Sequence, residues 1–98
     1  MTDAALPPGL EPRRRTRIFD EASLPAALRR EHRTKEGVWA VIHVLEGRLL
    51  YRVLDPPAET VLTPETPGMV RPEQPHAVTP LGAVRLFLEF HARPDAPG

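Results

Sequence analysis

The residue best placed for chemistry in this 98-residue chain is His76, which directly follows a segment framed by two prolines. Proline fixes φ and lacks an N–H, so Pro72 and Pro75 belong at a turn or at the first residue of a strand. His76 is therefore predicted to begin a strand on rigid backbone, a setting that suits a metal ligand or a catalytic group. The alternative is a surface or core histidine whose hydrogen bonds are already satisfied.

His32 and Glu89 are the two other candidate ligands of a metal site. Two neutral imidazoles and one carboxylate from different strands form the set that binds non-haem Fe(II), and a catalytic Zn²⁺ is held by a similar set. If the connection at 80–82 closes a hairpin, Glu89 lies near His76 in the register and both side chains reach one metal. The alternatives are an exposed loop position for His32 and a solvated edge-strand position for Glu89.

The last predicted strand, residues 84–91, has two different faces. The face predicted to be core carries Val84, Leu86, Leu88 and Phe90. The other face either meets solvent or lines a cavity, and it carries Arg85, Phe87, Glu89 and His91. In a barrel, an inward carboxylate between aromatic residues can build a small-molecule or metal site. The candidate walls of such a pocket are Trp39, Tyr51 and Phe87, while His43 is either a fourth wall residue or a polar residue on the outer face.

The run Arg13-Arg14-Arg15-Thr16-Arg17 concentrates positive charge. One hypothesis is a strip that binds phosphate or another oxyanion, and the alternative is a solvated run at the edge of the fold. No aromatic residue interleaves with the arginines, as single-strand nucleic-acid binding requires, which favours the solvated run.

Composition excludes several classes of protein. The chain has no cysteine, so a zinc finger, a disulfide framework, a thiolate nucleophile and a redox pair are excluded. A formal net charge of zero argues against a general binder of nucleic acid or of membranes. No apolar run approaches the length of a membrane span and no targeting segment is recognisable, so a cytoplasmic protein is predicted.

Short strands separated by turns predict an all-β sandwich or barrel. The strongest signal is 38–45, a β-branched and aromatic run, and Glu46-Gly47 is predicted to turn the chain so that 48–54 returns as its hairpin partner. Residues 26–33 fit either a helical turn or a strand and are interpreted as extended. The remaining predicted strands are 16–20, 59–62, 69–71, 76–79 and 84–91.

Five blocks of sequence, in this order and spacing, together resemble a known family. They are 24–28 (LPAAL), 32–39 (HRTKEGVW), 44–52 (VLEGRLLYR), 67–76 (PGMVRPEQPH) and 84–90 (VRLFLEF). The chain is similar to the small bacterial cupin family associated with tellurite resistance, the TehB-like domain. The resemblance covers about residues 15 to 92.

The resemblance implies a cupin-type double-stranded β-helix, a jelly-roll barrel with a metal inside. Its recurring ligands correspond to His32, His76 and Glu89, and the metal is a divalent ion, Zn or Fe first, with Mn or Ni as alternatives. Thr34 and Ala40 stand where the general cupin motif has a second histidine and a glutamate, so the four-ligand cupin site is not reproduced. The implied organisation is a flexible arm at 1–14, a cupin domain at 15–93 and a tail at 94–98.

Three functions follow from these observations. The first is a metal-binding cupin of stress-response type, with the metal acting on a small organic or oxyanionic molecule. The second is a non-catalytic module that binds or senses a small ligand. The third is an interaction domain. Resemblance to the cupins also implies a homodimer, with a small-molecule ligand and neither nucleic acid nor membrane as a partner.

Overall fold

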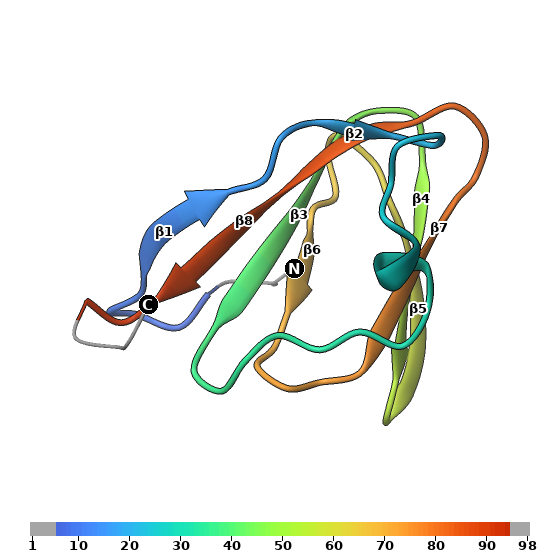
Figure 1. Ribbon diagram of the computed structural model, residues 1–98. Coiled ribbons are helices and arrows are strands. Elements are labelled where there is room, and N and C mark those ends of the chain that lie inside the picture. The colour runs from blue at the N-terminus through green and yellow to red at the C-terminus, as the bar shows by residue number, and fades with distance from the viewer. Residues whose placement is uncertain (1–5, 95–98) are drawn as a thin grey trace.

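Two antiparallel β-sheets lie face to face in the computed structural model, which describes residues 6–94 (Figure 1). The larger sheet has the order β1-β8-β3-β6, with β2 also paired to β8, and the smaller has the order β5-β4-β7. The larger sheet is formed by β1 (Glu11–Arg15), β2 (Phe19–Asp20), β3 (Trp39–Glu46), β6 (Gly68–Val70) and β8 (Arg85–Ala92). The smaller is formed by β4 (Leu49–Leu54), β5 (Pro57–Leu62) and β7 (His76–Pro80).

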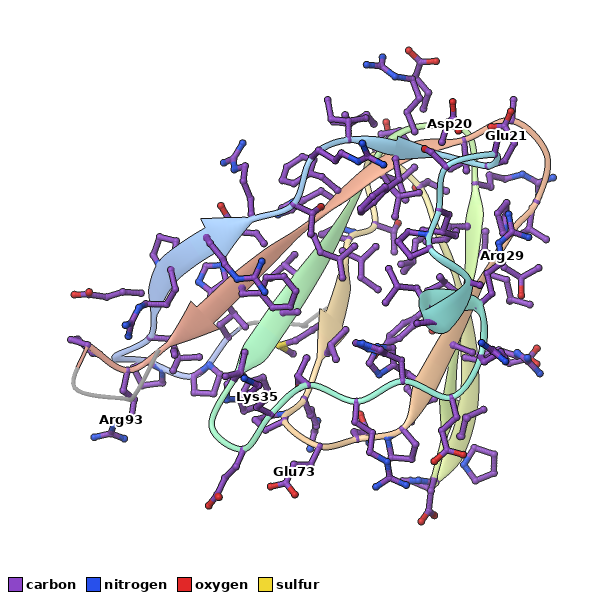
Figure 2. All side chains as sticks on the ribbon, in the orientation of Figure 1. Asp20, Glu21, Arg29, Lys35, Glu73 and Arg93 are labelled. Atoms are coloured by element: carbon purple, nitrogen blue, oxygen red, sulfur yellow. The ribbon has the colours of Figure 1, made fainter. Side chains whose placement is uncertain are left out.

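Side chains fill the space between the sheets and form one apolar core (Figure 2). Successive residues of a strand point to opposite faces, so every second residue of β3 and β8 reaches this core. The buried residues of these two strands include Ala40, Ile42, Val44, Leu86 and Leu88. Their counterparts in the smaller sheet include Leu49, Tyr51, Leu62 and Val78. Burial of this apolar surface stabilises the sandwich by about 25 cal/mol per Å².

The all-β class predicted from the sequence is confirmed. Five predicted strands, 38–45, 48–54, 69–71, 76–79 and 84–91, agree with β3, β4, β6, β7 and β8 to within one residue at each end. The two sheets remain separate and are not closed into a barrel. No helix within positions 6–94 is long and apolar enough to cross a membrane.

The predicted hairpin between 38–45 and 48–54 is wrong, because β3 and β4 belong to different sheets. The connection at Gly47 crosses from one sheet to the other. Gly47 has φ +82°, and a Cβ on it would lie 2.1 Å from the carbonyl oxygen of Ala83. Glycine is therefore required by a close crossing of two backbones and not by a hairpin turn.

The first third of the chain also departs from prediction. Residues 11–15 form β1 and pair with β8, although the sequence predicted a flexible arm through residue 14. The strand predicted at 16–20 is reduced to β2, and η1 (Ala26–Arg29) is a 3-10 turn where extended backbone was predicted. Pro25 precedes this turn and its carbonyl accepts a hydrogen bond from the N–H of Leu28 at 3.0 Å, which explains the turn. The beginning of the predicted arm, 1–5, and residues 95–98 of the predicted tail lie outside the described residues.

Candidate functional site: a cation-lined cavity beside two histidines

A short segment before β3 brings His32 beside His76. The backbone N–H of His32 donates to the carbonyl of His76 at 2.8 Å, and the N–H of His76 donates back at 3.0 Å. The N–H of Glu73 donates to the carbonyl of Thr34 at 3.1 Å, and the Thr34 hydroxyl donates to the carbonyl of Arg71 at 3.3 Å. Segment 32–34 is thus fixed along residues 71–76, and His76 begins β7, as the sequence predicted.

His76 is a buried, neutral imidazole. The residue is 2% exposed, and its Nδ1 lies 2.9 Å from the carbonyl oxygen of Gln74. A carbonyl only accepts, so Nδ1 carries the proton and Nε2 keeps its lone pair. Burial lowers the pKa of His76 below its ordinary 6.5, the charge of His32 lowers it further, and the bond to Gln74 opposes both. The ring meets that of His32 edge-on, with centroids 5.4 Å apart.

The two histidines border spaces of very different size. His76 borders a narrow space of about 10 Å³ shared with Ile42, Val78 and Leu88, which is too small for a ligand. His32 borders a cavity of about 400 Å³, a volume typical of small-molecule sites. Nδ1 of His32 is buried and has no hydrogen-bond partner among the described residues. His32 is therefore the member of the pair that a bound molecule can reach.

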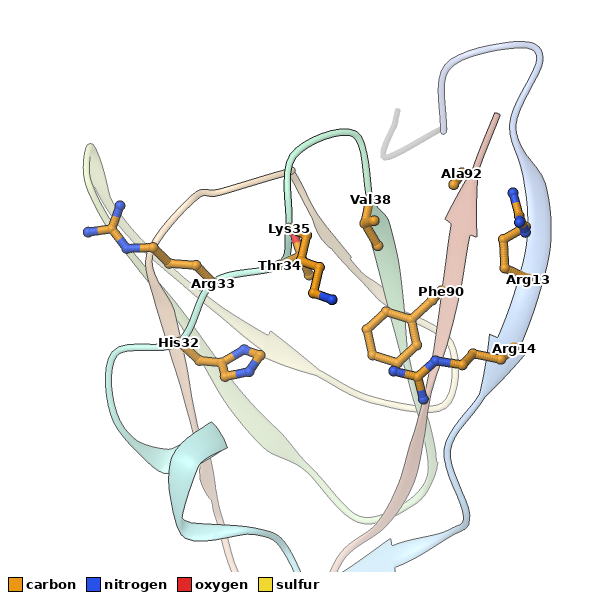
Figure 3. Close-up of a pocket in the computed structure, with 9 residues that line it drawn as sticks. All are labelled: Arg13, Arg14, His32, Arg33, Thr34, Lys35, Val38, Phe90 and Ala92. Carbon is orange, nitrogen blue, oxygen red and sulfur yellow. The ribbon is translucent and has the colours of Figure 1, made fainter. Parts of the chain in front are cut away.

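The larger cavity is lined by four cations (Figure 3). Arg13 and Arg14 come from β1, while Arg33 and Lys35 come from the segment after His32. No acidic side chain is found in the lining contributed by residues 6–94. Thr34 and three apolar residues, Val38, Phe90 and Ala92, complete the lining with His32.

A β-bulge explains how two consecutive arginines reach the same cavity. Pro12 pairs with His91 and Arg14 with Phe90, so Arg13 is an extra residue without a counterpart on β8. In a regular strand Arg13 and Arg14 point to opposite faces, and the bulge breaks this alternation. The guanidinium of Arg14 then lies over the ring of Phe90, 4.6 Å from its centroid.

Glu89, the third predicted ligand, is not brought to the two histidines. The prediction depended on a hairpin between the last two strands, but β7 pairs with β4 and β8 pairs with β3. Leu88 and Phe90 face the interior of the sandwich, so Glu89 between them points outward. The outer face of the larger sheet is where it finds its partners.

Glu89 instead belongs to a cluster that we call the outer cluster: Arg15, His43, Phe87, Glu89 and His91. Glu89 Oε1 lies 3.1 Å from Nε2 of His91 and 3.6 Å from Nε2 of His43, and Arg15 reaches Oε2 at 3.2 Å. Phe87 stacks on His43, with centroids 4.8 Å apart, and Arg15 lies over its other side. The hydrogen bond from His91 lowers the pKa of Glu89, and Arg15 and His43 act in the same direction.

The four predicted pocket residues divide between the two faces. Tyr51 is buried beside His76, with ring centroids 5.9 Å apart, and its hydroxyl donates to the carbonyl of Met69 at 2.9 Å. Trp39, His43 and Phe87 lie on the outer face and do not border the cavity. The sequence left both interpretations of His43 open, and the outer one agrees with the structure.

The residues present do not reproduce a three-ligand metal set. Within the described part of the chain, no group of three or more histidine, aspartate or glutamate side chains is arranged to hold a metal ion. His32 and His76 offer two ring nitrogens without a protein carboxylate. Binding of a divalent metal stays a prediction.

The sequence interpretation missed four residues that the structure places at the cavity. Arg13 and Arg14 were visible as a charged run, but the solvated interpretation was favoured. Phe90 was assigned to the core, and Lys35 was treated as part of a chain break. The signal available was the pairing of an arginine run with a second basic segment, 33–35, beside a candidate histidine.

Known proteins share both the sequence pattern and this fold. Residues 14–88 match the family described as the TehB-like domain, and that match covers most of the chain. The chain belongs to the TehB-like domain family. The resemblance predicted from the sequence is confirmed, and with it the association with tellurite resistance. No match to this TehB-like domain was found among curated proteins.

Several solved structures resemble this TehB-like domain. The crystal structure of TehB from Haemophilus influenzae gives a TM-score of 0.80 at 27% identity, covering 88% of this chain and 32% of that one. The domain therefore spans about a third of the length of that TehB chain. A protein from Escherichia coli K12, solved by structural genomics, gives 0.87 at 17% identity, covering 95% and 100%. The FeII form of HppE gives 0.58 at 22% identity, covering 85% and 43%. The last two likenesses concern the fold alone.

Proposed function

We propose that this TehB-like domain binds a small anion and serves the tellurite-resistance family as a ligand-binding or sensing module. The observation that carries the proposal is the cavity of about 400 Å³ that contains four cationic side chains and, among the described residues, no acidic one. Like charges gathered around one cavity repel one another. A bound anion removes this repulsion, so the site favours negative ligands.

The cations differ in how free they are to bind. Arg33 forms an ion pair with Glu31 at 2.8 Å, and Arg13 donates to the carbonyl of Arg93 at 2.9 Å. Within residues 6–94, neither Arg14 nor Lys35 has an ion pair. Arg14 keeps its fork of N–H donors, which matches two oxygens of a carboxylate or phosphate, and Lys35 adds a point charge.

His32 adds a polar contact at the inner end of the cavity. His32 is half-buried and its ring borders the cavity, while its Nδ1 is buried and has no hydrogen-bond partner among the described residues. Binding of an anion at this cavity would use only residues of this chain. The non-catalytic binding or sensing function therefore has more direct support than the metal-dependent one.

The anion site is tested by calorimetric titration with inorganic phosphate and, separately, with tellurite. Arg14→Gln removes a cation from the cavity, and Arg15→Gln removes one from the next position of the same strand but from the outer cluster. We expect about a tenfold loss of affinity for the first, the size of one charge-assisted hydrogen bond, and less than about a twofold loss for the second. Equal losses in both would indicate unspecific charge attraction. Absence of binding at millimolar anion would overturn the proposal.

Binding of a divalent metal, as Zn or Fe with Mn or Ni as alternatives, is proposed for His32 and His76 on the closeness of their rings. Glu89, the third ligand that the sequence predicted, lies on the outer face of the larger sheet. Elemental analysis of the purified protein beside His76→Ala and Glu89→Ala tests it. Loss of metal in both variants would support the three-ligand set. Loss in His76→Ala alone would assign the ion to the histidine pair, and no metal in the wild type after reconstitution would contradict both.

The cupin-type jelly roll is proposed on the two facing antiparallel sheets and on the likeness to the H. influenzae TehB structure. The homodimer and the cytoplasmic location stay predictions. Light scattering on the purified chain distinguishes a dimer from a monomer of 10.9 kDa.

A further inference from the structure

The volume of the cavity is large for an inorganic anion. A water molecule takes about 30 Å³ of liquid, so about 400 Å³ is room for roughly a dozen waters. An oxyanion such as phosphate or tellurite has only a few oxygens around one central atom and leaves most of that space empty. Cavities of this size typically enclose organic molecules with many more heavy atoms.

One wall of the cavity is apolar. Val38, the residue before β3, and Phe90 and Ala92, on the neighbouring strand β8, face the same space. Ala92 is 4% exposed, and Val38 and Phe90 are half-buried. Hydrated inorganic ions gain nothing from such a wall, whereas a hydrocarbon group gains about 25 cal/mol for each Å² that it buries.

Charged and apolar side chains lie side by side around the space. Figure 3 shows the Lys35 amine and the Arg14 guanidinium extending toward the cavity from two different segments, with the ring of Phe90 beside the guanidinium of Arg14. Arg33 extends away from the cavity in the same view, toward its ion pair with Glu31. An anionic group therefore has two cations to bind, and the remainder of the molecule lies along Val38, Phe90 and Ala92.

From the volume of the cavity and its combination of cationic and apolar side chains, we infer that the ligand is a small organic acid with an apolar body, and not a bare inorganic oxyanion. This inference rests on the proposed anion-binding function and names the class of ligand for that site. The acid group lies between Arg14 and Lys35, near His32. The hydrocarbon part covers the apolar wall.

Two sulfonates of equal charge distinguish the contribution of the apolar body to affinity from that of the anionic group. Methanesulfonate and benzenesulfonate each carry one negative charge throughout the neutral range, and they differ only in the hydrocarbon group. We expect benzenesulfonate to bind at least about tenfold more tightly in calorimetric titration, because the phenyl ring adds buried apolar surface. Arg14→Gln is expected to weaken both probes.

A nearly isosteric variant locates the apolar contact. Val38→Thr places a hydroxyl in the cavity wall, and Val41→Thr makes the same change on the outer face of β3 as a control. We expect Val38→Thr to weaken benzenesulfonate about threefold or more, to leave methanesulfonate within about twofold, and Val41→Thr to change neither. Thermal melts of both variants establish that they fold.

The outcomes separate the inference from the function beneath it. Equal affinity for the two sulfonates and for phosphate would overturn the inference of an organic ligand but would still support the proposed anion site. Benzenesulfonate could bind more tightly than methanesulfonate with an affinity that neither Arg14→Gln nor Val38→Thr changes. That result would place the benzenesulfonate site outside this cavity and overturn the inference. No binding of phosphate, tellurite or either sulfonate would overturn the anion-binding function itself.

Discussion

Two groups of polar side chains lie on the opposite faces of strand β8, and they differ in whether their charges have partners of opposite sign within the protein. On the outer face, Glu89 has three partners within 3.6 Å, two histidines and an arginine. On the inner face, Arg14 and Lys35 border the cavity, and no ion pair is found for either among the described residues. Both systems use the same strand and similar residue types.

The difference separates a structural cluster from the cavity that we propose as an anion-binding site. In the outer cluster, favourable contacts are complete within the protein, so no external molecule is needed to balance them. Around the cavity, charges of one sign meet across a space, and their balance has to come from outside the chain. Histidine and glutamate, the residue types that suggested chemistry in the sequence, therefore belong partly to the system that requires no ligand.

The largest expected difference between the two faces concerns packing. Leu86 is fully buried on the inner face, so Leu86→Ala is expected to lower the free energy of unfolding by about 2–5 kcal/mol. Phe87→Ala, its outer neighbour, loses stacking on His43 and Arg15 and is expected to cost about 1 kcal/mol. Urea unfolding measures both. A larger loss for Phe87→Ala would mean that the outer cluster is covered in solution.

Removal of a hydrogen bond should also destabilise the protein more on the inner face than on the outer face, but by smaller amounts than the loss of packing. Tyr51→Phe removes the donor to the carbonyl of Met69 and is expected to cost about 1–2 kcal/mol. Burial raises the pKa of Tyr51 to about 12, so the hydroxyl keeps its proton throughout the neutral range. Glu89→Gln breaks ion pairs that are partly solvated and is expected to cost less than about 1 kcal/mol. The comparison fails if Glu89→Gln proves the more damaging in urea unfolding.

Acidification should affect the two faces in separate pH ranges. The pKa of His76 is below its ordinary 6.5, so the unfolded chain binds this proton first and stability falls as pH drops through and below 6.5. The pKa of Glu89 is also lowered, but from 4.5, so its contribution is present above 4.5 and is lost below it. Melting temperatures from pH 8 to 3.5 should show both falls. His76→Gln is expected to flatten the upper one alone, and Glu89→Gln the lower one alone.

The smallest expected changes in stability concern single arginines of β1, measured in the absence of ligand. Arg14→Gln relieves repulsion around the cavity and should leave the melting temperature unchanged or slightly higher at low salt. Arg15→Gln breaks the contact with Glu89 and should lower the free energy of unfolding by up to about 1 kcal/mol. Phosphate should raise the melting temperature of the wild type more than that of Arg14→Gln, because a ligand that binds only the folded state stabilises it. A uniform response of both variants to phosphate would argue against a localised site.

Much of the fold could be predicted because alternation of apolar and polar residues is written along each strand. Residues 38–45 and 84–91 show this pattern, and both are strands. Which strands pair is decided by contacts between distant segments, and local sequence does not record it. Gly47 is an example, since the same residue satisfies a hairpin turn and the crossing between sheets that the structure contains.

The candidate site could be predicted in part for the same reason. His32 and His76 were selected individually and lie side by side, because a short segment pairs with the start of β7. Glu89 was assigned to them through a strand pairing that does not occur. The contribution of Arg13 and Arg14 depends on a single unpaired residue in β1, and a bulge of this kind leaves no mark in the pattern of residue types.

The position of β1 in the chain has a consequence for how such domains diversify. The family match begins at residue 14, so Arg13 lies just before it and Arg14 at its first position. Every residue of β1 is exposed, whereas the apolar wall belongs to β8 and to the residue before β3. Substitution in β1 can therefore exchange the charge at the cavity at little cost to the core. If the cavity binds an anion as proposed, its ligand preference can be changed in this way while the core of the sandwich stays the same.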